Sequence, residues 1–200
     1  TYPEIYEVGS SNLGHIILYS ILNAVPGQLC DRAYLPAADL SERLKERNQA
    51  LFAVESRRPL PAFDILGFSL SYELGATNIL GRVDLAKVPL YAAERGDLPL
   101  SHPESPPLIF AGGPTATSNP EPYAAFFDFI ALGDGEELLP EIGLVVAEAK
   151  AAGLSRMDLL RDLAVVPGVY VPSLYGPDQQ GISVEPLEAG LPARLLRRVA

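Results

Sequence analysis

The sequence predicts an α/β fold of the flavodoxin-like (Rossmann-type) kind, with a doubly wound parallel sheet of about five strands, then a C-terminal helix and a β-hairpin. Stretches typical of strands and of helices alternate over the first 153 residues, at a spacing that implies right-handed crossovers and a parallel sheet. The best-defined strand is apolar on both faces, as in the middle of a parallel sheet. Five such units favour the strand order 2-1-3-4-5.

Five stretches are predicted to be strands because apolar residues gather between turn signals. They are residues 4–8, 29–35, 63–71, 106–113 and 126–136. The strongest of them is FDILGFSLS at 63–71. All five are expected to lie side by side in one sheet.

Helices are predicted between and after these strands, where apolar residues recur at i, i+3 and i+4. They cover residues 13–24, 39–47, 72–86, 136–152 and 155–163. Asp39 with Glu42, and Ser155 with Asp158, have the spacing of a capping box at the start of their helices. Gly153 is expected to end the long fourth helix.

The pattern changes after Gly153, which divides the chain into two expected parts. Residues 1–153 form the α/β domain, and residues 154–200 form a linker with one short helix and a β-hairpin at 168–187. The last residues, GLPARLLRRVA, carry neither a helix C-cap nor a polar tail. We therefore expect a further domain to follow them.

Composition excludes several classes of protein. A hydrophobic content of 48% is ample for a core, and the net charge of −10 argues against a nucleic-acid partner, which needs clustered Lys and Arg. No apolar run reaches the ~18 residues of a membrane span, and the start lacks the features of a secretory signal. The single cysteine, Cys30, suits a reducing, cytoplasmic location.

Four turns rich in small residues follow predicted strands: GSSNLG, SLSYE, AGGPTATSNPEP and GDGEE. Parallel sheets bind ligands outside the carboxyl ends of their strands, so these turns are candidates to bind a small-molecule cofactor. The candidate binding residues are Gly9, Ser10, Ser11, Asn12, Gly14, Ser69, Ser71, Tyr72, Gly112, Gly113, Pro114, Gly133, Asp134, Gly135 and Glu136. GSSNLG is not the G-x-G-x-x-G dinucleotide fingerprint.

Each turn also has an explanation that needs no ligand. Ser or Asn in the first turn caps the helix that follows, and the turn at 111–122 is an ordinary loop before a helix. The carboxylates of GDGEE suit the positive end of a helix dipole.

The sequence contains no recognisable catalytic or metal-binding set. His15 and His102 are the only histidines, both are expected at the surface, and no Cys/His spacing indicates a metal site. Neither a phosphate-binding P-loop nor a nucleophile elbow is present. Glu136 and Glu137 are adjacent, unlike an acid/base pair.

Several stretches, in order, resemble one protein family. FAGGPTATSNPEPYAAFFDFIALGDGEELLPEI is similar to the GG-P-x-A…NPE…D…GDGE/GEGE-x-x-L-P-E-I signature of the N-terminal, cobalamin (B12)-binding-type domain of B12-domain radical SAM proteins. YPEIYEVGSSNLGHIILYSILN, ESRRPLPAFDILGFSLSYELGATNIL and VPGVYVPSLY resemble an uncharacterised branch described as Fe–S oxidoreductases. The likeness runs from Tyr2 to about Tyr175.

The resemblance implies that cobalamin is the small-molecule cofactor. It also implies a downstream radical SAM barrel as the domain's partner, with a [4Fe–4S] cluster and S-adenosylmethionine. The cluster needs C-x-x-x-C-x-x-C, which Cys30 alone does not supply, so this chemistry is expected only in that following domain. This chain by itself is expected to have no catalytic residues.

The chain departs from cobalamin domains of the mutase type in two places. Their D-x-H-x-x-G motif, aligned on Gly14, meets Gly9 and Ser11, so the histidine that ligates cobalt is missing. In the Ser-x-Leu element Ser69 is kept and Ser71 replaces the leucine, whereas the Gly112–Gly113 pair is kept.

Two functions remain open at this point. Either the domain binds cobalamin without a protein histidine ligand and presents it to the barrel, or it is a degenerate, cobalamin-free domain that serves substrate access or protein interaction. A corrin needs a wide floor of small residues at the strand ends. Large side chains such as Tyr72 or Phe110 on that floor would favour the second function.

Overall fold

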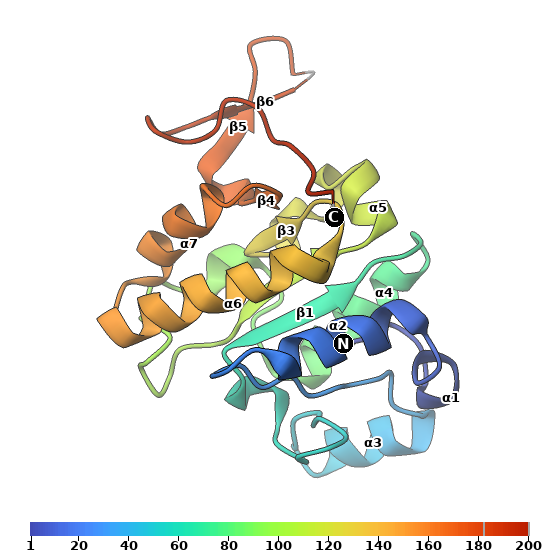
Figure 1. Cartoon of the computed structure of the whole chain (residues 1–200). Helices are drawn as coiled ribbons and strands as arrows, with labels where there is room; N and C mark the ends of the chain where they lie inside the picture. Colours follow the sequence, from blue (N-terminus) through green and yellow to red (C-terminus); the bar gives the residue numbers. More distant parts are fainter. Residues whose placement is uncertain (182, 200) are drawn as a thin grey trace.

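The computed structural model describes residues 1–181 and 183–199 and confirms the α/β class (Figure 1). Its main sheet has the order β1-β2-β3-β4, with β1, β2 and β3 parallel and β4 antiparallel to β3. These strands are β1 (Ile65–Ser69), β2 (Leu108–Gly112), β3 (Phe129–Ala131) and β4 (Val169–Tyr170). A separate antiparallel hairpin joins β5 (Tyr175–Pro177) to β6 (Val184–Pro186), as predicted. Ile182, in its turn, and Ala200 lie outside the described residues.

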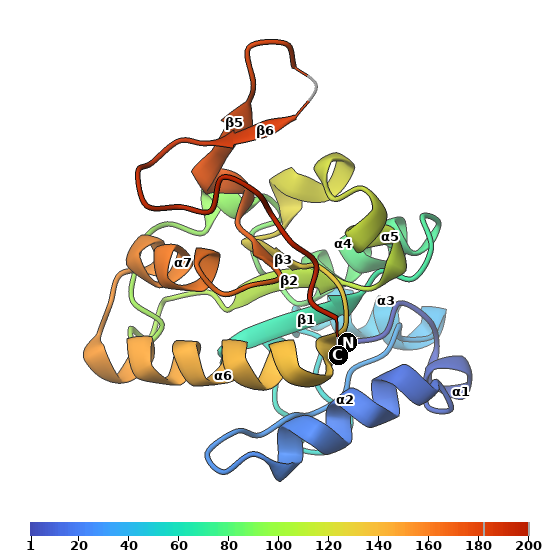
Figure 2. The same cartoon turned by 45° about the horizontal axis from the view of Figure 1, so that its top comes forward.

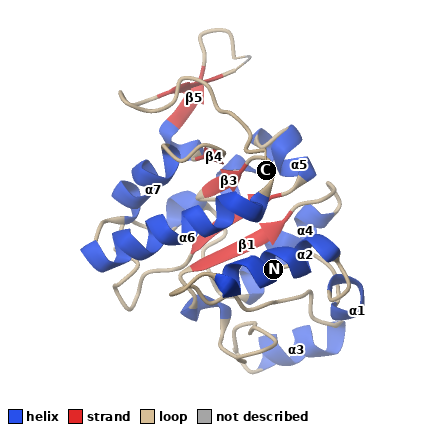
Figure 3. Ribbon diagram, in the orientation of Figure 1, coloured by secondary structure: helices blue, strands red, loops and turns tan. Residues whose placement is uncertain are grey.

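Helices cover both faces of the main sheet (Figures 2 and 3). The α-helices are α1 (Tyr6–Gly9), α2 (Leu13–Ala24), α3 (Ala38–Glu46), α4 (Gly75–Leu85), α5 (Pro114–Ser118), α6 (Gly135–Ala152) and α7 (Arg156–Ala164). Short 3₁₀ helices are η1 (Leu60–Ala62), η2 (Ala92–Glu94), η3 (Glu121–Phe126) and η4 (Pro172–Leu174). Among the described residues, no helix is both long and apolar enough to cross a bilayer.

α2 and α6 run side by side on one face, whereas α4 lies on the other (Figure 1). Leu18 lies against Gly135 at the start of α6, and the Gln28 amide donates to the Pro140 carbonyl at 2.9 Å further along it. The two helices therefore point the same way, and both begin at the carboxyl edge of the parallel strands.

The core is built on β1, β2 and β3, whose side chains are largely buried on both faces. The Phe110 ring stacks on Phe129, with centroids 4.8 Å apart, and covers Gly67 on the neighbouring strand. A side chain at Gly67 would collide with this ring, because its Cβ would lie 2.5 Å from Phe110. The glycine is thus required by packing within the sheet.

The first two predicted strands are wrong. Residues 4–8 run into α1, and residues 29–35 form no strand. Both stretches are nevertheless joined, because Tyr2 N–H donates to the Ala33 carbonyl at 3.0 Å and Leu35 N–H donates to the Glu4 carbonyl at 2.8 Å. The Tyr2 carbonyl accepts from the Arg82 guanidinium instead of from this segment, and the chain enters α1 at Tyr6, so a regular ladder does not form.

The expected linker after Gly153 packs closely on the α/β part. α7 contacts α6, and β4 adds to the main sheet instead of to the hairpin. Gly153 ends α6 in the left-handed conformation, with φ 68°, as predicted. The division of the chain at this residue stays a prediction.

The two predicted capping boxes differ in outcome. Ser155 is the N-cap of α7, and its hydroxyl accepts from Asp158 N–H at 3.2 Å, as predicted. The box at Asp39 is wrong: α3 begins at Ala38 after the uncapped Ala37. Asp39 therefore lies in the first turn, where its charge suits the helix dipole but its side chain does not cap the helix.

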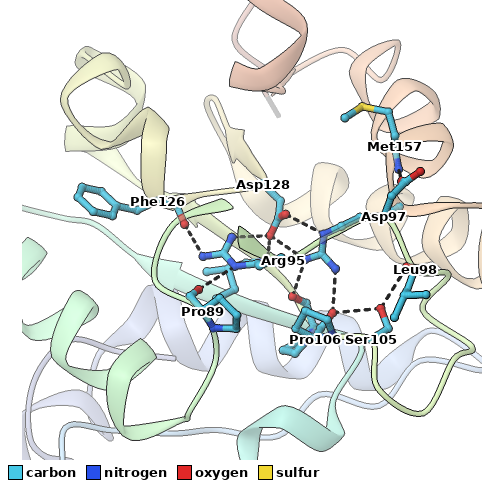
Figure 4. Close-up of polar contacts among 12 residues, drawn as sticks. Pro89, Arg95, Asp97, Leu98, Ser105, Pro106, Phe126, Asp128 and Met157 are labelled. Atoms are coloured by element: carbon cyan, nitrogen blue, oxygen red, sulfur yellow. Dashed lines mark hydrogen bonds and ion pairs between the residues drawn. The ribbon is translucent and has the colours of Figure 1, made fainter. Parts of the chain in front are cut away.

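A buried ionic cluster holds the amino ends of β2 and β3 together (Figure 4). The Asp128 carboxylate accepts from the Arg95 guanidinium at 2.8 Å, from the Arg156 guanidinium at 3.0 Å and from Ile109 N–H at 2.7 Å. Both arginines also donate to backbone carbonyls, including those of Phe126 for Arg95 and of Pro106 for Arg156. This network lies at the edge of the sheet opposite the predicted binding turns, and nothing in the sequence pattern pointed to it.

Candidate functional site

The carboxyl edge of the three parallel strands is lined by small residues. In the register of the sheet, Ser69 of β1 pairs with Gly112 of β2, and Gly112 pairs with Ala131 of β3. These three are the last residues of their strands, so they form one level row, which we call the strand-end row. Ligands of doubly wound proteins lie outside such an edge.

The first predicted turn, at residues 9–14, is used mainly for packing. Gly9 is buried beneath two aromatic rings, and a Cβ there would lie 2.6 Å from Tyr34 and 2.8 Å from Tyr2. Asn12 is the N-cap of α2, where its Oδ1 accepts from His15 N–H at 2.9 Å and its Nδ2 donates to the Tyr2 hydroxyl at 3.1 Å. The capping explanation therefore holds for Asn12.

The other residues of this turn are nearer the surface. Ser10 ends α1, and the exposed Ser11 hydroxyl donates to the Val8 carbonyl at 3.3 Å. Gly14 is exposed in the first turn of α2. The turn reaches the carboxyl edge through the start of α2.

The second turn follows β1 and is tied to the N-terminal segment. The Ser69 and Ser71 hydroxyls hydrogen-bond each other at 3.0 Å. The Tyr72 hydroxyl donates to the Glu4 carboxylate, and the Tyr72 side chain is partly exposed at 37%. Tyr72 thus lies at the rim beside Glu4.

The third turn follows β2 and approaches the second one closely. Gly113 has φ 109°, and a Cβ there would lie 3.0 Å from the Leu70 carbonyl oxygen. Leu70 N–H donates to Gly112 O at 2.7 Å, and the Leu70 carbonyl accepts from Thr115 N–H at 3.2 Å. Glycine at 113 is thus explained by backbone contact between the two turns, and Pro114 begins α5 directly after it.

The fourth turn, after β3, carries contacts that the sequence did not indicate. Gly133 has φ 103°, and its N–H donates to the Thr117 hydroxyl at 3.1 Å. Asp134 N–H donates to the Arg198 carbonyl at 3.0 Å. Gly135 packs against Leu18, and Glu136 is exposed in the first turn of α6. Thr117 and Arg198 were missed because each is brought here only by the path of the chain.

Residues 14–172 match the family model described as radical SAM proteins, N-terminal. The chain belongs to this family. No curated protein and no solved structure matches the chain. The family description names radical SAM proteins alone, and the matched range includes three of the four turns in full.

His15 of this radical SAM N-terminal domain is half-buried among aromatic rings, deeper than the expected surface position. Its ring stacks on Tyr2 at 5.7 Å and meets the edge of Tyr34 at 5.5 Å. Burial lowers the pKa of His15 from 6.5 to about 3, with nearby positive charge adding to the effect. His102 is exposed, as predicted.

One hollow lies next to the strand-end row and another lies away from it. A small apolar hollow of about 10 Å³ lies between α4 and η3 and is bordered by Leu70, just after β1. A shallow hollow of about 340 Å³ lies between α6 and α7, away from the four turns. Within the described ranges, no group of three or more His, Cys, Asp or Glu side chains could hold a metal ion.

Proposed function

We propose that this domain is the cofactor-binding module of a radical SAM protein, and that it binds cobalamin at the strand-end row without a histidine ligand of its own. In this proposal it presents the cofactor to a barrel with a [4Fe–4S] cluster and S-adenosylmethionine in the same polypeptide. The observation that carries the proposal is the level row formed by Ser69, Gly112 and Ala131. A flat macrocycle requires such a wide, small-residue floor.

The size and position of the residues at this edge support the proposal. Phe110 lies two positions before Gly112 and covers Gly67, so its ring does not fill the floor. Tyr72 is held at the rim through Glu4. The Ser69–Ser71 pair and the Gly112–Gly113 backbone would hold the ligand, with Pro114 at the side.

The protein's contribution in this proposal is binding and orientation. Bound cobalamin supplies a cobalt atom that carries a carbon group, and the chemistry belongs to the cofactor. The seryl hydroxyls donate or accept hydrogen bonds at the edge of the ligand, and the glycines let the backbone approach it. The position of His15 supports a site in which it does not ligate cobalt, since its ring packs against Tyr2 and Tyr34.

A second candidate is a cobalamin-free domain that serves substrate access or protein interaction. It is favoured by the fourth turn, where the backbone of Arg198 lies on Gly133 and accepts from Asp134 N–H. It is also favoured by the small volume, about 10 Å³, of the hollow beside Leu70. In this candidate the glycines are explained by packing alone.

Titration with hydroxocobalamin and methylcobalamin, followed by gel filtration, distinguishes the two. We expect retained corrin absorbance with a base-off spectrum. Gly112→Leu adds a side chain to the strand-end row, with its Cβ 3.5 Å from the Ala131 Cβ, and is expected to weaken binding at least about ten-fold, because overlap with a rigid ligand is not relieved. Gly81→Leu is the matched control, since a Cβ at Gly81 in α4 meets nothing within 4 Å.

The titration is made on this chain and on the natural polypeptide that contains it. Retention with equal loss in both glycine variants would contradict a site at the strand-end row. No retention by either protein would support the cobalamin-free domain.

A further inference from the structure

The last described residues return to the main sheet and cross the carboxyl end of β3 (Figure 2). Arg198 N–H donates to the Leu132 carbonyl at 2.8 Å, and Asp134 N–H donates to the Arg198 carbonyl at 3.0 Å. Arg198 thereby forms a parallel bridge with Gly133. We call residues 195–199 the strap.

The surface under the strap is shaped for it by two glycines. A Cβ at Gly133 would lie 1.9 Å from the Arg198 carbonyl oxygen, and one at Gly168 would lie 3.0 Å from the Arg198 Cβ. Both glycines have positive φ, 103° and 97°. Side chains at these positions would prevent the strap from lying on the end of β3. The contact therefore requires glycine at both positions.

Leu195, the first residue of the strap, is partly buried against the core, whereas the side-chain attachments of Arg198 lie near the surface. The Arg198 guanidinium pairs with Glu141 at 3.2 Å and with Glu137 at 3.5 Å, and these glutamate side chains are 40% and 64% exposed. Leu196 and Val199 on either side are 59% and 63% exposed. Exposed ion pairs contribute little and are screened by salt, so the strap is held far less firmly than the strands beneath it.

The strap also occupies part of the edge assigned to the ligand. The Arg198 carbonyl of the strap accepts from the Asp134 N–H, a backbone donor of the fourth turn, and the strap covers Gly133. A ligand that extends from Ser69 and Gly112 to the end of β3 therefore meets the strap first.

We propose that residues 195–199 are a displaceable strap, held by Arg198, that covers the β3 end of the strand-end row and leaves it when a ligand binds there. The ligand part of this inference rests on the proposed function, whereas the opening of the strap does not. Among the described residues, opening breaks the two backbone hydrogen bonds and the two surface ion pairs of Arg198, and it moves Leu195 away from the core. The strap thus makes access to the site depend on the segment that follows the hairpin.

Amide hydrogen exchange of the whole chain, resolved by NMR, tests the opening. The amides of Asp134 and Arg198 are expected to exchange together, at least about a hundred-fold faster than the buried Asp128 amide, which donates to the Ile109 carbonyl. Arg198→Ala is expected to raise exchange at Asp134 about five-fold, and added salt is expected to act in the same direction. Arg197→Ala, which removes the same charge from an exposed neighbour, is expected to change it less than two-fold.

Gly133→Ala supplies a second variant, because its methyl group would meet the Arg198 carbonyl. Gly153→Ala is its control: that glycine also has positive φ, but a Cβ there meets nothing within 4 Å. Asp134 exchange is expected to rise in the first and not in the second. Asp134 and Arg198 amides as slow as Asp128, or equal effects of the Arg197 and Arg198 variants, would overturn the strap.

Hydroxocobalamin is the probe for the ligand arm. Arg198→Ala is expected to bind it about five-fold more tightly than the wild type, with Arg197→Ala unchanged. If corrin binds but Arg198→Ala changes neither the amide exchange nor the corrin affinity, the strap proposal is overturned and the proposed function stands. A strap that opens, when neither this chain nor the natural polypeptide that contains it retains corrin, would instead overturn the proposed function and leave the strap proposal standing.

Discussion

At the scale of single residues, His15 shows how packing overrides a surface-like pattern. It lies in the first turn of α2, yet its ring packs against Tyr2 and Tyr34, and its buried Nδ1 has no hydrogen-bond partner among the described residues. Protonation would place an uncompensated charge in this aromatic group, which is why burial lowers its pKa to about 3. The neutral ring is therefore part of the folded state.

This environment predicts loss of stability in mild acid. Since the pKa of His15 is about 3 when folded and 6.5 by itself, the unfolded chain binds more protons between these values. The contribution of His15 is fully present above pH 6.5 and falls as the pH drops toward 3. Its slope stays below the single-proton limit of about 1.4 kcal/mol per pH unit, because solvent partly screens the half-buried ring.

Urea unfolding between about pH 7 and pH 5 measures this effect. His15→Phe keeps an aromatic ring and removes the titration, so part of the acid loss should disappear. His102→Phe, at an exposed histidine, should leave the slope unchanged. An identical slope in His15→Phe and the wild type would show that His15 titrates at its ordinary pKa.

At the scale of elements, helix starts follow local hydrogen bonding where the capping side chain is in place. Ser155 caps α7 as its sequence spacing predicts, whereas Asp39 lies two residues after the N-cap position of α3. The two helices differ in where the backbone changes from the extended to the helical conformation. α3 starts after the extended residue Ala37, two residues earlier than an N-cap at Asp39 requires.

Ser155→Ala should lower the free energy of unfolding by about 1 kcal/mol, the usual effect of losing an N-cap serine. The removed hydroxyl leaves the Asp158 N–H at the start of α7 without its acceptor. Ser41→Ala is the control, since the Ser41 hydroxyl donates to the Ala37 carbonyl within α3 and caps nothing. Urea unfolding of both variants checks the difference, and equal effects would argue against capping at Ser155.

At the scale of the whole molecule, the Asp128 network joins segments that are far apart in sequence. It connects the loop after η2 through Arg95, the start of β3 through Asp128 and the start of α7 through Arg156. Buried charges of this kind are tolerated only when each donor and acceptor is satisfied, which the backbone carbonyls complete here. α7 is thereby held on the α/β part of the chain.

Asp128→Ala should destabilise the protein by about 3–5 kcal/mol, because two buried guanidinium groups lose their shared carboxylate. Asp162→Ala, at an exposed aspartate of α7, should stay within about 0.5 kcal/mol. Urea unfolding measures both values. A small effect at Asp128 would mean that solvent reaches the arginines after the carboxylate is removed.

The fold and the site were predictable to different extents. Periodicity identified β1, β2, β3, the long helices and the hairpin, because each depends on which side chains of one segment face the core. The two predicted strands that are missing depend on a contact between distant residues, because the Tyr2 carbonyl accepts from the Arg82 guanidinium of α4 instead of from the segment at Ala33. The sequence marked the glycine-rich turns as special. It did not show why glycine is needed, because the contacts with Phe110, Leu70 and Arg198 come from distant parts of the chain.

The sequence by itself determined the α/β class, the family and the gathering of small-residue turns at one edge, since parallel strands carry their carboxyl ends to the same side. Only the tertiary structure decided the burial of His15, the Asp128 network and the position of the strap on Gly133. These features join residues that lie far apart in the chain. Their geometry depends on the whole path of the backbone, which local propensity and periodicity do not specify.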